Sequence, residues 1–141
     1  MNWGKAMLYV LLAEDNPGDV LLIREALQGG GFEFELTVQQ DGEKMLSYID
    51  LIDAGERRCP DIVLLDLNLP KRNGDVLLKR MRSSGCCRDV PVIIVTSSDS
   101  KRDRDMAARL GASDYFRKAN DFDEFMRLGA VVKRHTAGAL H

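Results

Sequence analysis

The sequence predicts an α/β protein built as a doubly wound sheet of five parallel strands, each followed by a helix, in a (βα)5 order. Short unbroken apolar runs, such as 7–13, 62–65 and 90–95, are typical of strands that a parallel sheet buries on both faces. Amphipathic segments separate these runs, and their apolar residues recur every three or four positions as in helices. Alternation of this kind indicates right-handed βαβ units and therefore a parallel sheet.

The first two predicted strands differ in pattern. The first, 7–13, is almost entirely apolar and ends in Glu14-Asp15-Asn16, of which the last two residues can cap the next helix. Pro17 suits the first turn of that helix, and Gly29-Gly30-Gly31 ends it. In 32–38 apolar and polar residues alternate, which predicts a half-exposed strand at or near an edge of the sheet.

The rest of the chain repeats the order of apolar run, polar end and helix. The predicted elements are, in order, helix 45–54, strand 62–65, helix 76–82, strand 90–95, helix 103–110, strand 113–117 and helix 122–132. Asp66 follows the third strand, Thr96-Ser97-Ser98 follows the fourth and Lys118 follows the fifth. Asp121 can cap the last helix.

The composition indicates one domain and excludes several classes of protein. A chain of 141 residues, 45% hydrophobic and 30% charged, fits a single globular domain, here 1–141 with its core in about 7–134. We expect a short frayed tail from Lys133 onward, containing His135 and His141, and no DNA-binding or catalytic output region after it. The net charge of -2 argues against binding to nucleic acid or to an anionic membrane.

The apolar runs and the cysteines indicate a cytoplasmic protein. No run approaches the roughly 20 residues that span a bilayer, and the first apolar stretch ends in acids rather than in a cleavage site for secretion. The three cysteines, Cys59, Cys86 and Cys87, form a poor disulfide framework because their number is odd and two are adjacent. We therefore expect reduced thiols, with Cys86-Cys87 an ordinary loop pair and redox sensing the minor alternative.

Polar side chains follow four of the predicted strands. They are Glu14 and Asp15, Asp66, Thr96 and Lys118. Taken singly, each acid has a simpler explanation as a cap, and the threonine as a partner of the backbone. The carboxyl ends of parallel strands, however, meet at one edge of a sheet. Three carboxylates and a backbone carbonyl there make a site for Mg²⁺, and the lysine and hydroxyl can bind a phosphoryl group. This set indicates phosphoryl chemistry at a carboxylate nucleophile.

These residues also carry a resemblance to a known family. The Glu14-Asp15 pair, Asp66 within LLDLNLP, Gly74, Thr96 and Lys118 stand in the order of a single-domain response-regulator receiver of two-component signalling, over roughly residues 7–134. The resemblance implies the flavodoxin-like strand order 2-1-3-4-5. The stretches AEDNPGDVLLIREAL and DLNLPKRNG further resemble the receivers that serve phytochrome-type sensor histidine kinases.

The resemblance implies a role for each residue of the site. Asp66 would accept the phosphoryl group from a kinase phosphohistidine. Glu14, Asp15 and Asp66 would hold Mg²⁺ together with the backbone carbonyl of Asn68. Lys118 would bind the phosphoryl group.

A switch is implied as well. Thr96 would bind a phosphoryl oxygen and shift toward it, and the ring of Tyr115 would turn inward when Thr96 moves. This movement would repack the face made by the fourth helix, fifth strand and fifth helix. One departure from the family concerns Lys118, which is followed by Ala119 instead of the usual proline. A cis bond before alanine costs about 2.5–4 kcal/mol, so we expect a trans bond and a lysine that still reaches Asp66.

The resemblance also implies partners: a sensor histidine kinase, a histidine phosphotransfer protein or downstream regulator, and a second copy of the chain on the switch face. Three alternatives stay open. One is a degenerate receiver that binds proteins without phosphorylation. Another is an aspartate-nucleophile phosphatase, although the second acid such enzymes need is replaced by Asn68. The last is a nucleotide- or flavin-binding protein, although no glycine-rich loop follows the first strand. We favour a signalling protein over an enzyme.

Overall fold

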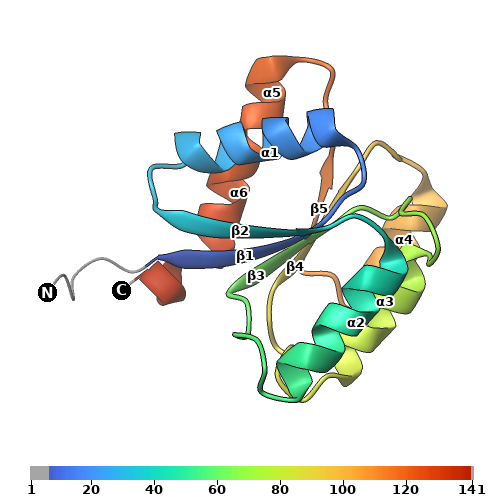
Figure 1. The fold of residues 1–141 in the computed structure, drawn as a ribbon. Coiled ribbons are helices and arrows are strands. Elements are labelled where there is room, and N and C mark those ends of the chain that lie inside the picture. The colour runs from blue at the N-terminus through green and yellow to red at the C-terminus, as the bar shows by residue number, and fades with distance from the viewer. Residues whose placement is uncertain (1–6, 141) are drawn as a thin grey trace, which may run out of the picture.

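One sheet of five parallel strands forms the centre of the protein (Figure 1). The computed structural model describes residues 7–140. Its strands are β1 Leu8–Ala13, β2 Phe34–Gln39, β3 Ile62–Leu65, β4 Val92–Thr96 and β5 Asp114–Arg117. They lie in the order β2-β1-β3-β4-β5, so the predicted α/β class and strand order are confirmed. Within the described residues the alternating strand β2 pairs only with β1 and forms one edge, as its pattern predicted.

Helices cover both faces of the sheet (Figure 1). They are α1 Pro17–Gly29, α2 Gly42–Asp53, α3 Gly74–Ser83, α4 Lys101–Arg109, α5 Phe122–Met126 and α6 Leu128–His135, followed by a short 3-10 helix, η1 Ala137–Leu140. α1, α5 and α6 pack together on one face, and α2, α3 and α4 on the other. No helix within residues 7–140 is long and apolar enough to cross a membrane.

The predicted last helix is divided into two. α5 ends at Met126 and α6 begins at Leu128, because the Arg127 N–H bonds back only three residues, to the carbonyl of Glu124 at 3.1 Å. Such a bond tightens the turn and interrupts the α-helical pattern. Asp121 caps α5 as predicted, its side chain accepting the N–H of Asp123.

The prediction of a frayed tail from Lys133 onward was wrong for the part up to His135, whereas His141 lies outside the described residues. α6 continues to His135, and Nε2 of His135 lies 2.9 Å from Oδ2 of Asp114, at the start of β5. Arg134 donates to the same oxygen at 2.8 Å. Asp114 stands 21 positions before His135, so no local pattern near the C-terminus could indicate this contact.

Buried apolar side chains fill the space between the sheet and each helical layer. Strands β1, β3 and β4 are buried along their whole length, so alternate residues face opposite layers. Leu11, Val63 and Ile94 belong to the core beneath α2 and α3, whereas Val10 and Leu64 belong to the core beneath α1 and α6. A strand with both faces covered is apolar throughout, which explains the unbroken runs.

The close packing of α1 and α6 depends on Gly129. A Cβ at this buried position would lie 2.3 Å from the carbonyl oxygen of Ala26 in α1.

Gly129→Ala should therefore lower the free energy of unfolding by about 1–3 kcal/mol, since the helices must move apart. Urea unfolding measures this. Gly29→Ala is the control, because a Cβ there meets nothing within 4 Å. Equal stability of the two variants would contradict the packing.

Candidate functional site

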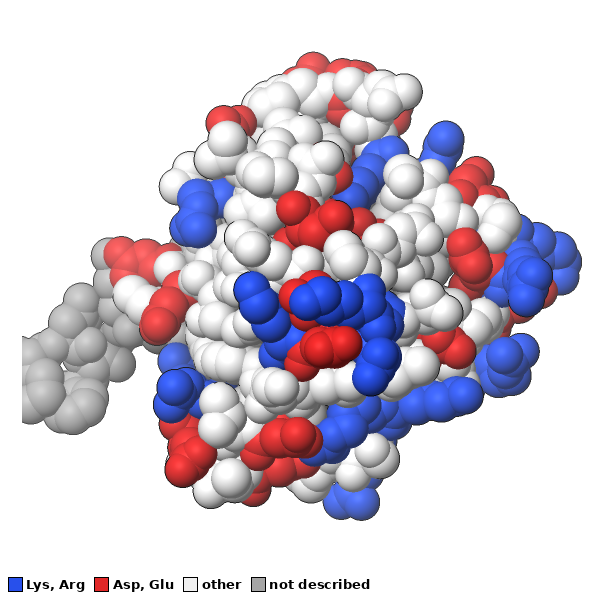
Figure 2. Space-filling model, turned by 45° about the vertical axis from the view of Figure 1, so that its right-hand side comes forward, with Lys and Arg blue, Asp and Glu red and all other residues white. Residues whose placement is uncertain are grey.

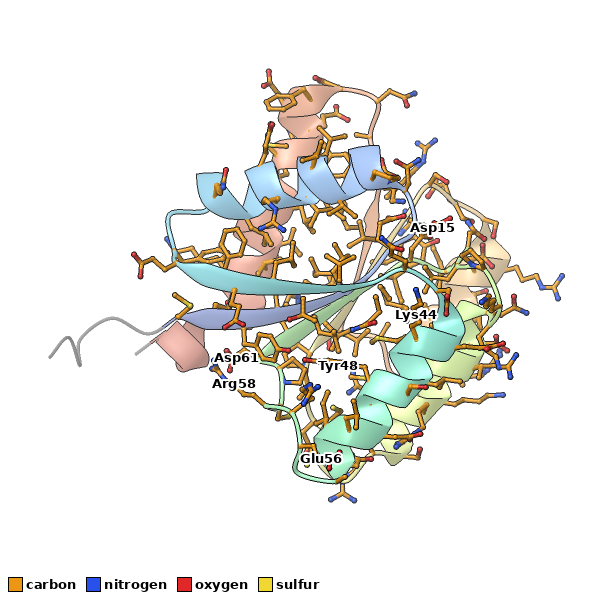
Figure 3. The ribbon with its side chains drawn as sticks, in the orientation of Figure 1. Asp15, Lys44, Tyr48, Glu56, Arg58 and Asp61 are labelled. Atoms are coloured by element: carbon orange, nitrogen blue, oxygen red, sulfur yellow. The ribbon has the colours of Figure 1, made fainter. Side chains whose placement is uncertain are left out.

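Parallel pairing brings the four polar strand ends together. The Asp66 N–H donates to the carbonyl of Ala13 at 3.1 Å, and the Lys118 N–H donates to the carbonyl of Thr96 at 2.7 Å. These bonds continue the strand pairing one residue beyond the sheet, so residues far apart in the sequence become neighbours. Figure 3 shows Asp15 at this end of the sheet, far from Arg58 and Asp61 at the opposite end.

Three carboxylates gather there as predicted. Glu14, Asp15 and Asp66 each place an oxygen within 4.8 Å of the others. Glu14 and Asp66 are buried, and Asp15 is exposed. One oxygen of Glu14 accepts the N–H of Asn16 at 3.1 Å, whereas the other, Oε1, is buried and lies 2.7 Å from Nζ of Lys118. Three carboxylate oxygens at this spacing are a set of hard anionic donors that fits a divalent cation.

Burial raises the pKa of the Glu14 carboxyl, although its contacts with Lys118 and Asn16 oppose the shift and the charge of Asp66 adds to it. The cause is that desolvation and a neighbouring negative charge both disfavour the ionised form. A cation bound here would offset this cost.

Lys118 lies at the centre of the acids. Its Nζ is 2.7 Å from Oε1 of Glu14, 2.8 Å from Oδ2 of Asp19 and 3.0 Å from Oδ2 of Asp66. Burial of the amine would lower its pKa, but the contacts with Asp19, Glu14 and Asp66 outweigh burial and raise it. The lysine therefore stays charged and partly neutralises the site.

The two predictions about the following residue are confirmed. No peptide bond within residues 7–140 is cis, so the bond before Ala119 is trans, and Lys118 still reaches Asp66. The contact with Asp19, by contrast, was not predicted. The only signal in the sequence is that Asp19 stands one helical turn after Asp15, in the first turn of α1.

The loop after β3 shapes the other side of Asp66. The Asn68 N–H donates to Oδ1 of Asp66 at 3.1 Å, and its side-chain amide lies 3.5 Å from Oγ1 of Thr96. Gly74 is required for this loop to close, since a Cβ there would lie 2.9 Å from Cα of Leu67. The metal role of the Asn68 carbonyl stays a prediction.

Thr96 and Tyr115 lie on the adjacent strands β4 and β5, where Thr96 pairs with Arg117 and Tyr115 with Ile94, and they are held differently. Thr96 is fully buried, and its hydroxyl accepts only long bonds, from Asn68 at 3.5 Å and from the Ser98 N–H at 3.4 Å. The hydroxyl of Tyr115 donates to the carbonyl of Ser98 at 2.9 Å, and the guanidinium of Arg104 lies 4.4 Å from its ring centre. The ring is thus tied to the loop after β4. Their switch role stays a prediction.

The sequence of the chain matches that of the response regulator receiver domain over residues 10–128. The chain belongs to this family. Among its relatives, the receiver is 33% identical to a probable methanogenesis regulatory protein, FilR2 of Methanothrix harundinacea, over 92% of this chain and 83% of that protein. It is 36% identical to the transcriptional regulatory protein CpxR of Escherichia coli over 89% of its own length, but it spans only 49% of CpxR.

Solved structures of receivers have the same architecture. The phosphorylated cyanobacterial phytochrome response regulator RcpA superposes with a TM-score of 0.83 at 27% identity, over 96% of this receiver and 98% of RcpA. The receiver domain of the sensor histidine kinase PA1611 from Pseudomonas aeruginosa, which holds a magnesium ion in its active-site cleft, superposes with a TM-score of 0.75 at 26% identity, over 94% and 99% of the two chains. The acidic cluster of this receiver is of the kind that can bind a divalent metal.

Removing the central amine should destabilise the receiver. Lys118→Met leaves Glu14 and Asp66 buried and uncompensated, so the free energy of unfolding at pH 7 should fall by about 3 kcal/mol. The loss should shrink at pH 5. The pKa of the Glu14 carboxyl is raised in the folded state relative to the unfolded chain. As the pH falls, the folded protein therefore takes up a proton first, and this stabilises the folded state of the variant.

Chemical denaturation at both pH values measures this effect. Lys101→Met is the matched control, because Lys101 is 90% exposed and pairs only with the exposed Asp105 in α4 among the described contacts. An exposed pair contributes about 0.5 kcal/mol. Losses of the same size in the two variants would contradict a central role for Lys118.

Proposed function

We propose that this receiver accepts a phosphoryl group on Asp66 from the phosphohistidine of a sensor histidine kinase. The observation that carries the proposal is the position of the Asp66 carboxylate. It lies 3.0 Å from the amine of Lys118 and beside Glu14 and Asp15, so a nucleophile, a fixed positive charge and a set of cation ligands share one edge of the sheet. This combination serves phosphoryl transfer, in which catalysis is mostly positioning and neutralisation of charge.

In the transfer, a carboxylate oxygen of Asp66 attacks the phosphorus atom, a P–O bond forms and the P–N bond to the kinase histidine breaks. The proposed metal ligands are Glu14, Asp15, Asp66 and the backbone carbonyl of Asn68, and bound Mg²⁺ would neutralise charge on the phosphoryl oxygens. Lys118 turns from the carboxylate to a phosphoryl oxygen. The electron pair of the broken P–N bond stays on the histidine, which departs as a neutral imidazole because its other ring nitrogen carries the proton, and the lysine keeps its charge.

Storage of the phosphoryl group, and not rapid hydrolysis, fits the residues around Asp66. A phosphatase of this kind needs an acid near the nucleophile to activate water. Asn68 stands there instead, and its amide is directed to Thr96. We therefore propose a signalling protein with at most slow loss of its own phosphoryl group. The feature that favoured a receiver without phosphorylation, Ala119 after Lys118, does not displace the lysine from Asp66.

Protein partners are the proposed output. A phytochrome-type kinase is the proposed phosphodonor, supported by the similarity to RcpA. A histidine phosphotransfer protein, a downstream regulator or a second copy on the α4-β5-α5 face would receive the signal by binding the phosphorylated receiver.

Acidic and basic side chains are intermixed on the face shown in Figure 2, which supports binding of proteins over binding of nucleic acid or membrane at that face. We place the receiver in the cytoplasm, where its three free cysteines would stay reduced.

Incubation with acetyl phosphate and Mg²⁺ should add one phosphoryl group, detected as intact mass. Asp66→Asn should remove the gain, because an amide is not a nucleophile here. Omission of Mg²⁺ should slow it strongly, since the acids then repel the donor. An unmodified wild type, under conditions that modify another receiver, would exclude the proposal, and turnover of a generic phosphate ester would favour a hydrolase.

Tyr115 should transmit the change at Asp66 to α4. In the wild type, phosphorylation should shift the amide NMR signals of α4 and β5 as well as those around Asp66. In Tyr115→Ala the mass gain should remain, but the shifts should stay near Asp66, because the contacts with Ser98 and Arg104 are lost. Shifts that still reach α4 in this variant would make Tyr115 an ordinary core residue.

A further inference from the structure

Asp19 differs from the other two acids that contact Lys118. It lies in the first turn of α1, whereas Glu14 follows β1 and Asp66 follows β3. Its side chain is 27% exposed, against 1% for Glu14 and 8% for Asp66. A partly exposed acid has less need of a partner than a buried one, yet its Oδ2 lies 2.8 Å from the buried amine. The contact therefore constrains Lys118 more than it relieves Asp19.

The position of Asp19 is itself fixed. Its N–H donates to Oδ1 of Asn16 at 3.0 Å, which caps α1, and Pro17 lies in the first turn. The carboxylate is thus carried on a rigid helix end, while Lys118 is carried on the loop that follows β5. A lysine side chain has four rotatable carbon bonds, and a rigid third partner removes much of this freedom.

Phosphoryl transfer, as proposed above, changes two of the three contacts. Glu14 is a proposed metal ligand, and the carboxylate of Asp66 becomes an acyl phosphate. Asp19 takes part in neither event. It is the one acid in contact with Lys118 whose carboxylate stays the same before, during and after transfer.

We infer that Asp19 is a positioning residue for phosphoryl transfer, which holds the amine of Lys118 over Asp66 while Glu14 and Asp66 change partners. The inference rests on the proposed function. The negative charge of Asp19 also repels the incoming phosphoryl group, so its removal has two opposite effects. Misplacement of the Lys118 amine should lower the rate more than the loss of this repulsion raises it, because solvent screens the charge of the partly exposed Asp19.

The test compares the initial rates of phosphorylation by acetyl phosphate at saturating Mg²⁺. Asp19→Asn keeps the size of the side chain and should lower the rate about tenfold. Glu43→Gln is the matched control, since Glu43 is also an acid in the first turn of a helix, α2, and should leave the rate within twofold. A loss below fivefold in Asp19→Asn, or a faster reaction, would overturn the inference.

Two further measurements separate positioning from other roles. The half-saturating Mg²⁺ concentration of Asp19→Asn should stay within threefold of the wild type, and a rate that recovers fully at high Mg²⁺ would mean that Asp19 acts on the metal instead. In a Lys118→Met background, Asp19→Asn should change the rate by less than twofold, because the group it positions is gone. A full tenfold effect in that background would also overturn the inference.

Failure of the positioning role can be distinguished from failure of the proposed function. A wild type that takes up no phosphoryl group would exclude both, whereas a wild type and an Asp19→Asn variant that react at the same rate would exclude the positioning role alone. The thermal unfolding midpoint shows whether each variant is folded. If Asp19→Asn is not, Asp19→Ser replaces it with the same expected and opposing results, because serine is accepted in the first turn of a helix.

Discussion

The burial of one amine among acids is the constraint on which this receiver depends. Three carboxylates lie within 3.0 Å of Nζ of Lys118, and the residues that carry two of them, Glu14 and Asp66, are buried. Without the amine, two buried negative charges would face each other in a medium that screens them poorly. The fold tolerates this arrangement because the surrounding sheet is packed on both faces and leaves the strand ends little freedom to separate.

The same arrangement stores electrostatic energy for function. The raised pKa of Glu14 shows that the folded protein holds this carboxyl in an unfavourable environment. In the proposed function, a bound cation would relieve this cost. Groups that are costly to bury and have defined partners are typical of functional sites. In the proposed function, stability and phosphoryl transfer therefore depend on the same few atoms.

The region around Thr96 is suited to changing its conformation. The hydroxyl of Thr96 is buried, but its two hydrogen bonds are long, at 3.4 and 3.5 Å, so a phosphoryl oxygen can compete for it at low cost. The Tyr115 ring lies on the adjacent strand, fixed to Ser98 and covered by Arg104. The predicted switch would have a local change in charge alter which of two packings is preferred. α4 carries Arg104 and would report the change on the protein surface.

The sequence by itself determined the fold class, the edge strand and the residues at the strand ends, because these depend on periodicities of two and 3.6 residues and on runs of apolar side chains. The order of strands and the roles in the site came from the resemblance to receivers. Only the tertiary structure decided that Asp19 binds Lys118, that His135 binds Asp114 and that the last helix breaks at Arg127. Asp19 and Lys118 are 99 positions apart. A local pattern records which face a residue occupies, but not which distant charge it meets, since that depends on how whole elements pack.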